Sequence, residues 1–188
     1  MQSKLNVLAI AGSLRRESYN RAALRAAQQL SPDDIELEIY DIGAVPPFNE
    51  DLEADPPPAV QDLRQHIHAA DALLIATPEY NYSIPGVLKN AIDWASRPAP
   101  NSSLNNKPAA IMGVSVGTFG TVRAQLHLRQ IFVYTNTLVL QRPLVHITYA
   151  AQKFDAQGRL IDEPTREQIR ALLAALARWA RHLSAFGD

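Results

Sequence analysis

The residues with the clearest potential for chemistry lie between residues 11 and 21, where an apolar run leads directly into a helical pattern. This segment carries three hydroxyl or amide side chains and three guanidinium groups: Ser13, Ser18, Asn20, Arg15, Arg16 and Arg21. Ser18 and Asn20 are both favoured N-cap residues, so a helix beginning here would offer free backbone N–H groups and the positive end of its dipole. This set of donors suits an anion such as a phosphate group.

An ordinary strand-to-helix loop with a good N-cap is the alternative to an anion site. The segment has neither the glycine triplet of dinucleotide-binding loops nor the Gly-Lys-Ser/Thr ending of the P-loop. An anion cradle would therefore depend on side-chain hydroxyls as well as on backbone groups.

Two further segments combine groups that suit a flat ligand. In residues 77–94, Pro78 and Pro85 stiffen the first part of the segment. The residues presented between these prolines include Glu79, Tyr80, Asn81 and Tyr82. Aromatic faces beside amide and carboxyl groups are typical of a site for a flat heterocycle. The second segment covers residues 115–121 and begins with Ser115. Its glycines, Gly117 and Gly120, would let the backbone approach that ligand closely. A plain turn with two surface tyrosines is the alternative for the first of these segments.

The elements that would position these segments form an alternating pattern. Apolar runs of strand length cover residues 5–11, 35–40, 72–77, 109–115 and 137–144. Helical patterns cover residues 20–30, 58–70, 85–95, 121–134 and 164–186, and residues 51–58 are expected to form an exposed loop. This alternation predicts an α/β fold, a doubly wound parallel sheet of five strands with helices on both faces. Because ligands bind at the carboxyl ends of such strands, the three segments are expected to converge there.

Composition narrows the classes of protein that fit this pattern. The 188 residues, of which 47% are hydrophobic, are enough for one domain spanning residues 1–188. A net charge of −1 indicates neither a nucleic-acid partner nor an anionic membrane surface. The absence of cysteine excludes disulfides and thiolate chemistry and fits a reducing compartment. We therefore expect a cytoplasmic protein.

Taken together, the three segments resemble the NADPH-dependent FMN reductase family, and within it the chromate and quinone reductase branch. The resemblance is carried by Gly-Ser-Leu-Arg-x-x-Ser-x-Asn at residues 12–20, Pro-Glu-Tyr-Asn-x-Ser-x-Pro-Gly-x-Leu-Lys-Asn-Ala-Ile-Asp-Trp at residues 78–94, and Ser-x-Gly-x-x-Gly at residues 115–120. It spans roughly residues 4–180, and the long middle motif is the most specific part. Arg16 and Glu17 stand where relatives often have small residues.

The resemblance implies a flavodoxin-like fold with strand order 2-1-3-4-5, FMN as cofactor and NADPH or NADH as co-substrate. The residues implied to hold the FMN phosphate are Ser13, Arg15, Ser18 and Asn20. Those implied to border the isoalloxazine and the ribityl chain are Pro78, Glu79, Tyr80 and Asn81, with Ser115 and Gly117 bordering the ring from the next loop. Family members form homodimers or homotetramers, so the same is expected here.

The chemistry implied by the resemblance is a ping-pong hydride transfer through flavin N5. The acceptors would be small molecules: quinones, azo compounds, free flavin or metal oxyanions such as chromate. No protein nucleophile, dedicated acid or metal is required for either half-reaction. Two alternatives stay open: a flavodoxin-like electron carrier, against which the near-neutral charge argues, and a non-catalytic nucleotide-binding module.

Overall fold

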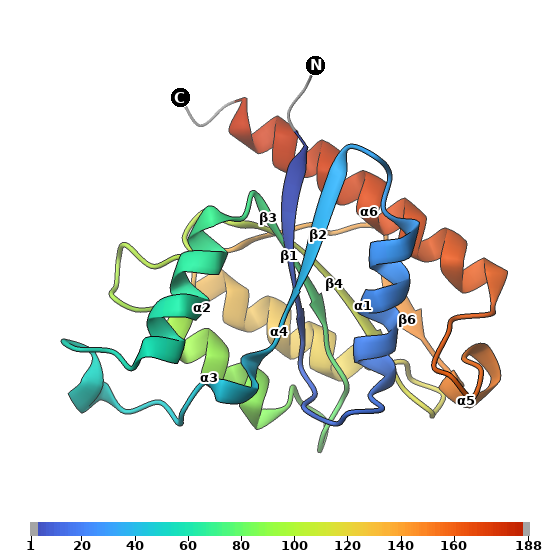
Figure 1. Cartoon of the computed structure of the whole chain (residues 1–188), viewed down its shortest axis with the longest axis horizontal. Coiled ribbons are helices and arrows are strands. Elements are labelled where there is room, and N and C mark those ends of the chain that lie inside the picture. The colour runs from blue at the N-terminus through green and yellow to red at the C-terminus, as the bar shows by residue number, and fades with distance from the viewer. Residues whose placement is uncertain (1–3, 186–188) are drawn as a thin grey trace.

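The computed structural model describes residues 4–185, which form a parallel sheet covered by helices (Figure 1). The strands are β1 (Leu5–Ala11), β2 (Ile35–Tyr40), β3 (Ala72–Ala76), β4 (Pro108–Val114), β5 (Leu138–Val139) and β6 (Val145–Ile147). The strand order is β2-β1-β3-β4-β5, with β6 also paired to β4. In the central register Val7 pairs with Leu37 on β2 and with Ala72 on β3. The predicted flavodoxin-like order is confirmed.

Helices cover both faces of the sheet, as the alternating sequence pattern predicts (Figure 1). The helices are α1 (Tyr19–Leu30), α2 (Pro58–Ala69), α3 (Gly86–Ala95), α4 (Val122–Tyr134), α5 (Ala150–Lys153) and α6 (Glu163–Ser184), with short 3-10 turns at Ile42–Ala44 and Glu50–Leu52. Most buried apolar residues of α1 and α6 belong to one core cluster, and most of those of α2, α3 and α4 belong to the other. Most helix boundaries lie within two residues of those predicted. The predicted end of the last helix at Phe186 lies outside the described residues.

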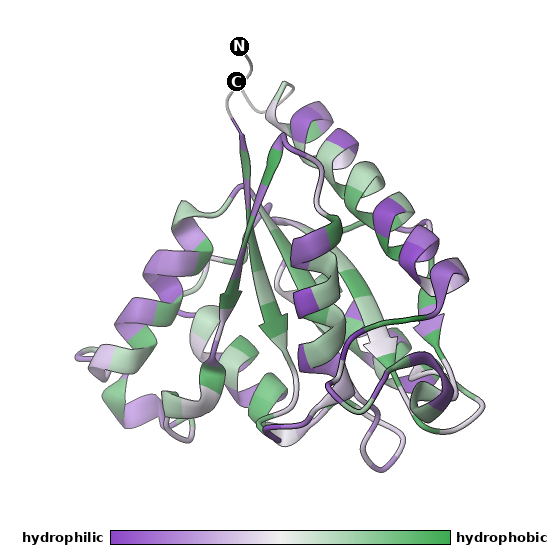
Figure 2. Ribbon diagram, turned by 45° about the vertical axis from the view of Figure 1, so that its right-hand side comes forward, coloured by the Kyte–Doolittle hydropathy of each residue, from purple (hydrophilic) through white to green (hydrophobic). Residues whose placement is uncertain are grey.

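The central strands are apolar on both faces because each face is covered by helices. On β1, Val7 and Ala9 face the α1–α6 layer, and Leu8 and Ile10 face the layer of α2, α3 and α4. Figure 2 shows the hydropathy of the same elements: the strands are green over much of their length with purple at their polar residues, and the helices carry both green and purple residues. Trp94, on α3, is fully buried.

The fifth predicted strand is wrong in its extent. Instead of one strand over residues 137–144, the chain forms β5 and then β6, and both pair in parallel with β4. The physical reason is Pro143, which has no N–H to donate to a ladder and interrupts the strand. Pairing resumes at Val145, opposite Met112. The fifth position of the sheet is thus shared by two short strands.

None of the helices formed by residues 4–185 has the length and apolar composition needed to span a membrane.

The N-terminus of α6 provides a test of helix capping. The Asp162 carboxylate accepts a hydrogen bond from the Thr165 N–H at 3.0 Å and another from the Thr165 hydroxyl. The hydroxyl bond is the main cause that lowers the pKa of Asp162 below its usual value. Asp162→Ala should therefore lower the free energy of unfolding by about 1 kcal/mol at neutral pH.

The difference in the free energy of unfolding between the wild type and Asp162→Ala should depend on pH, and this dependence identifies the Asp162 carboxylate as its cause. Because the pKa of Asp162 is lower in the folded than in the unfolded state, its ionised carboxylate stabilises the folded protein above the unfolded pKa of about 4. This stabilisation is lost as pH falls through the folded pKa. Urea unfolding of the wild type and Asp162→Ala should therefore converge below about pH 4. Asp162→Asn keeps an acceptor without titrating and should stay close to the wild type at neutral pH. A difference independent of pH would contradict the assignment.

Candidate functional site

The loop after β1 leads into α1 through a capped helix start. The hydroxyl of Ser18 accepts hydrogen bonds from the N–H groups of Asn20 at 3.2 Å and Arg21 at 3.4 Å, so Ser18 is the N-cap. Ser13 is buried, and its hydroxyl accepts the N–H of Arg15 at 3.4 Å. The exposed Arg15 guanidinium lies over the ring of Tyr19, 5.9 Å from its centroid. Two hydroxyls and one exposed cation therefore face the start of α1.

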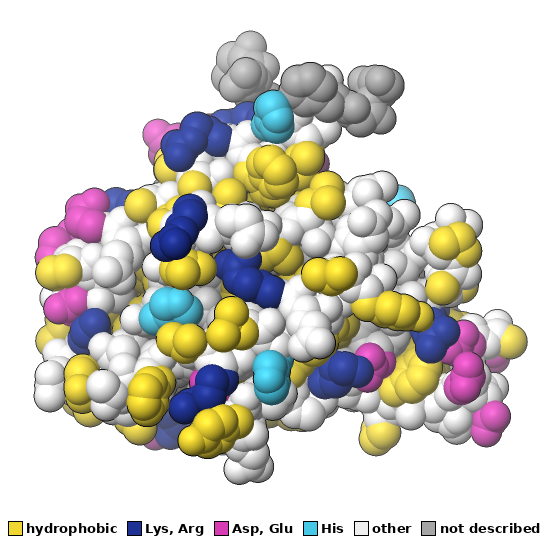
Figure 3. All heavy atoms as spheres, turned by 180° about the vertical axis from the view of Figure 1, so that it is seen from behind, with side chains coloured by type: hydrophobic (Ala, Val, Ile, Leu, Met, Phe, Trp, Pro, Cys, Tyr) yellow, Lys and Arg dark blue, Asp and Glu magenta, His cyan; other side chains and the backbone are white. Residues whose placement is uncertain are grey.

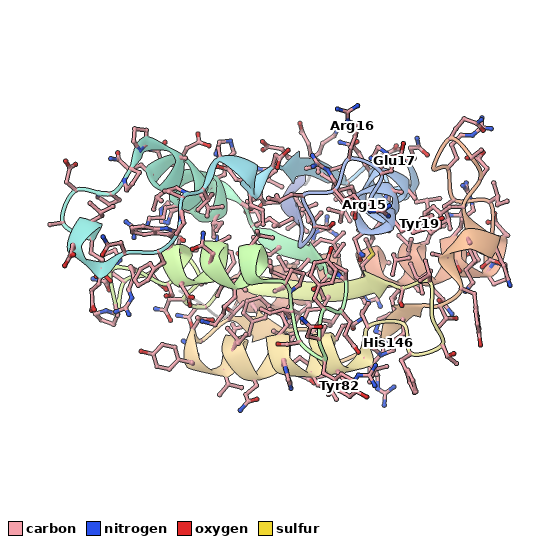
Figure 4. The ribbon with its side chains drawn as sticks, turned by 90° about the horizontal axis from the view of Figure 1, so that it is seen from below. Arg15, Arg16, Glu17, Tyr19, Tyr82 and His146 are labelled. Carbon is pink, nitrogen blue, oxygen red and sulfur yellow. The ribbon has the colours of Figure 1, made fainter. Side chains whose placement is uncertain are left out.

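Arg21 does not join this group of donors. Its guanidinium forms an ion pair of 2.7 Å with Asp41, which follows β2. The hydrogen bond from Arg21 is also the main cause that lowers the pKa of Asp41. Of the three arginines in the segment, Arg15 remains beside the helix start, whereas Arg16 extends outward from the ribbon in Figure 4.

Asn20 joins the first loop to the end of β4. Its side-chain amide donates to the Val114 carbonyl at 3.0 Å, and its carbonyl oxygen accepts the Val114 N–H at 2.9 Å. Asn20 is buried, and both polar ends of the side chain are engaged with the backbone next to Ser115. The role of Asn20 in the structure is thus to hold the start of α1 against the third loop.

The loop after β3 contains a tight hairpin. Tyr80 and Ser83 exchange two backbone hydrogen bonds of 2.9 Å, and the two residues between them, Asn81 and Tyr82, have φ of 50° and 67°. Two central residues with positive φ are typical of a type I′ turn. The hydroxyl of Tyr80 lies 3.5 Å from that of Ser13. The hairpin therefore reaches the first loop, and Asn81 and Tyr82 are exposed at its tip.

Pro78 and Gly12 bring the backbones of the first two loops together. A Cβ added to Gly12 would lie 3.3 Å from Pro78 Cδ and 3.0 Å from Leu88 Cδ2, so a larger residue would press against both neighbours. Pro78 is buried in this contact. The glycine of the first motif thus serves packing between loops.

Glu79 faces the start of α4. Its carboxylate accepts hydrogen bonds from the N–H groups of Arg123 at 3.0 Å and Ala124 at 3.3 Å, and it pairs with the Arg123 guanidinium. A carboxylate at this position satisfies free N–H groups and complements the helix dipole. Thr121, the N-cap residue, makes no side-chain cap bond, so Glu79 supplies the cap from the neighbouring loop.

The loop after β4 is packed closely against the other two. A Cβ on Gly113 would lie 1.9 Å from the Thr121 hydroxyl oxygen and 2.5 Å from the Thr77 carbonyl oxygen. Gly120 has φ of 53° and lies against His146. By contrast, a Cβ on Gly117 would meet only the Ser115 hydroxyl oxygen, at an ordinary contact distance of 3.6 Å, and the Gly117 N–H donates to that hydroxyl at 3.0 Å. Close packing therefore explains why glycine occupies positions 113 and 120, whereas Gly117 lies in an exposed part of the loop.

The three loops meet at one edge of the sheet, as predicted. Ser13 contacts Tyr80, Asn20 binds Val114, and Glu79 caps α4, so each loop is tied to the other two. Figure 4 looks onto this edge, with Arg15 and Tyr19 toward one helical layer and Tyr82 and His146 toward the other. Burial is the main cause that lowers the pKa of His146, which favours its neutral form.

The donor chemistry at this edge fits the phosphate of FMN. Ser13 and Ser18 provide hydroxyls, Arg15 provides an exposed guanidinium, and α1 begins there with its positive dipole end. Hydroxyls, a cation and a helix start are the groups that hold phosphate in proteins. The exposed rings of Tyr80 and Tyr82 lie on the neighbouring hairpin.

Several residues that shape the site were not identified from the sequence. They are Arg123, Thr121, Phe119 and Gly113. Gly113 lies inside an apolar run, where a glycine often marks a close approach of another backbone, and this signal could have found it. For Arg123, no local pattern points to a partner 44 residues away.

The strand order, with the loop that carries Ser13, Arg15 and Ser18 at the switch between β1 and β3, defines a flavodoxin-like α/β protein. The family comparison is more specific. The chain belongs to the NADPH-dependent FMN reductase family, whose model matches residues 5–152. This match covers the whole sheet and all three loops.

Individual relatives agree with this assignment over nearly their full lengths. An NAD(P)H-dependent FMN reductase of Pseudomonas aeruginosa is 54% identical over 184 residues, covering 97% of this chain and 99% of the relative. A 2-hydroxy-1,4-benzoquinone reductase of a Burkholderia species is 41% identical over 177 residues, covering 94% and 97%. Among solved structures, the flavoenzyme NAD(P)H:(acceptor) oxidoreductase FerB of Paracoccus denitrificans has a TM-score of 0.87 at 36% identity, covering 95% and 98%.

Proposed function

We propose that this chain is an NAD(P)H-dependent, FMN-containing oxidoreductase that reduces quinones. The observation that carries the proposal is the meeting of the three loops at the carboxyl edge of the sheet, where phosphate donors and exposed aromatic rings adjoin. The family and its FMN reductase and quinone reductase members support the same conclusion. Azo compounds, free flavin and chromate are further acceptors that we propose on the resemblance alone.

In this proposal the protein binds and orients its ligands. Bound FMN would supply the hydride-transfer chemistry of a reaction in which NAD(P)H, a quinone and one proton give NAD(P)⁺ and a hydroquinone. Ser13, Arg15 and Ser18 bind the phosphate. Asn20 holds the helix start that faces the phosphate. The backbone of residues 115–120 and the segment Pro78, Glu79, Tyr80 and Asn81 border the ring. We further propose that residues 1–188 form a single FMN-binding domain.

An anaerobic absorbance experiment tests the function directly. The purified protein is loaded with FMN, and its spectrum is recorded before NADPH, after NADPH and after benzoquinone. We expect rapid bleaching of the flavin band by NADPH and full recovery with the quinone. A bound flavin that NADPH cannot bleach would support an electron carrier instead. A protein that binds no FMN would support a nucleotide-binding module.

The role of Arg15 is tested by FMN affinity. Arg15→Ala removes the exposed guanidinium beside the helix start and should weaken FMN binding by about 1.5 to 3 kcal/mol, roughly tenfold to 100-fold in Kd. Fluorescence titration of the apoprotein with FMN measures this change. Arg16→Ala is the matched control, because Arg16 extends away from the site (Figure 4). Equal Kd values for the wild type and Arg15→Ala would remove Arg15 from the phosphate site.

We also propose that the protein forms a homodimer or homotetramer. The outer face of α4 exposes Leu126, Val133 and Tyr134, and hydrophobic side chains are prominent on the surface seen from behind in Figure 3. Contiguous exposed apolar side chains are typical of protein interfaces. Light scattering should give a mass of two or four chains, and Tyr134→Glu should reduce that mass. A cytoplasmic location also stays a prediction, which cell fractionation can test.

A further inference from the structure

The guanidinium of Arg123 lies between two aromatic rings at the edge of the site. Its central carbon is 3.9 Å from the ring centroid of Tyr82 and 4.6 Å from that of Phe119. Tyr82 belongs to the loop after β3, and Phe119 belongs to the loop after β4. One cation on α4 therefore holds an aromatic ring from each of two loops that adjoin the FMN site.

The hairpin that carries Tyr82 is fixed to α4 at further points. Glu79 pairs with the Arg123 guanidinium and accepts the N–H groups of Arg123 and Ala124. Ser83 shares a hydrogen bond of 3.0 Å with the ring of His127, one helical turn beyond Arg123. These contacts hold the hairpin in place, so the Tyr82 ring has a defined position.

The two rings nevertheless remain open to solvent. Tyr82 is 67% exposed and Phe119 is 63% exposed, although both contact Arg123. Because Glu79 neutralises the guanidinium, this surface has little net charge to attract simple anions. Exposed ring faces in fixed positions suit a flat aromatic ligand, which gains from stacking.

We propose that Arg123 is a positioning residue that holds Tyr82 and Phe119 as an aromatic wall of the acceptor site, and that this wall selects planar aromatic acceptors. The inference rests on the proposed function, since it assigns a selectivity to the same site. The wall distinguishes acceptors by shape. Stacking on the wall strengthens the binding of a planar quinone, whereas a compact acceptor that takes electrons without stacking binds no better because of it.

The kinetic test compares two acceptors at saturating NADPH, with each variant fully loaded with FMN. Tyr82→Leu should raise the KM for a naphthoquinone about threefold to tenfold, the scale of a lost aromatic stacking contact, and leave kcat nearly unchanged. With ferricyanide, which is not planar, the same variant should match the wild type. Tyr82→Phe keeps the ring and should restore the low KM for the naphthoquinone. Ile161→Ala, which trims an exposed side chain outside the three loops, controls for general surface effects.

A second readout needs neither FMN nor turnover. In the ¹⁵N-labelled apoprotein, the Arg123 Nε–H donates to Glu79, which moves its NMR signal downfield and slows its exchange, and the rings of Tyr82 and Phe119 over the guanidinium add an opposing upfield ring-current shift. Tyr82→Leu should reduce the upfield shift. Arg123→Lys keeps the charge but loses the planar fork, so it should raise the naphthoquinone KM as Tyr82→Leu does.

The outcomes separate this proposal from the function on which it rests. If the wild type reduces neither acceptor, the proposed function fails. If the wild type reduces both and Tyr82→Leu changes neither KM, or changes both equally, the wall is overturned while the function stands. An Arg123 Nε–H signal that Tyr82→Leu does not move would also overturn the stack. A variant that fails to fold is detected by circular dichroism, and the exposed position of Tyr82 keeps Tyr82→Leu available as a folded variant.

Discussion

Gly113→Ala should lower the free energy of unfolding by about 3 kcal/mol, the upper part of the usual range for an overpacked core. The new Cβ would lie 1.9 Å from the Thr121 hydroxyl oxygen and 2.5 Å from the Thr77 carbonyl oxygen. Thr121 is buried with φ of 68°, and its hydroxyl accepts a hydrogen bond from Gln125, so it has little freedom to move. The backbone at Thr77 would have to shift as well. Equilibrium unfolding in urea measures the loss.

Two further variants distinguish this clash from a general effect of replacing glycine. Gly86→Ala is the control, because a Cβ at Gly86 meets no atom within 4 Å, and its stability should equal or slightly exceed that of the wild type. Adding Thr121→Gly to Gly113→Ala removes the hydroxyl and the positive-φ side chain and should recover part of the loss. The contact with Thr77 would persist in the double variant. An unfolding midpoint for Gly113→Ala equal to that of the wild type would contradict the packing argument.

The bounds of a strand in this protein could be predicted from the sequence where the hydrophobic pattern of that strand is uninterrupted. Residues 5–11 and 35–40 form β1 and β2 with the predicted bounds, because the first run is almost continuously apolar and the second alternates buried Ile35 and Leu37 with exposed Glu36 and Glu38. The run at residues 137–144 misled because the apolar residues 138–140 were extended across Gln141, Arg142 and Pro143 to Leu144, although Pro143 has no N–H for a ladder. β6 was missed because three residues give too short a pattern to recognise.

The location of the site could be predicted from the sequence, but most of the hydrogen bonds and ion pairs within it could not. The loops could be placed at one edge because parallel strands end together. The partners of Asn20 and Glu79 could not be predicted, since Val114 lies 94 residues from Asn20 and Arg123 lies 44 residues from Glu79. Both side chains have the polarity that a ligand would need, so sequence alone does not separate binding a ligand from fixing a loop. Their predicted contacts with FMN stay predictions.

Asn20→Ala should destabilise the protein by about 2 to 5 kcal/mol, because it leaves two backbone groups of Val114 without partners in a buried position. Asn20 satisfies the Val114 N–H and carbonyl together, at 2.9 Å and 3.0 Å. Gln28→Ala is a matched control on the same helix. The Gln28 amide also donates to a backbone carbonyl, that of Leu37 at 2.8 Å, but Gln28 is exposed and water can replace it. Urea unfolding should show a much smaller loss for the control.

Asn20→Asp tests whether hydrogen bonding or packing causes the loss. An aspartate of similar size can still accept the Val114 N–H, but its second oxygen would face the Val114 carbonyl unless it is protonated. That repulsion and burial should raise the pKa of the new carboxyl in the folded state, so the stability of the variant is retained at low pH and lost as pH rises through this raised pKa. Its deficit relative to the wild type should therefore shrink between pH 7 and about pH 5. A deficit that does not change with pH would assign the effect to packing. If hydrogen bonding to Val114 is the cause, Asn20→Ala should also weaken FMN binding indirectly, because the start of α1 would no longer be held beside the third loop.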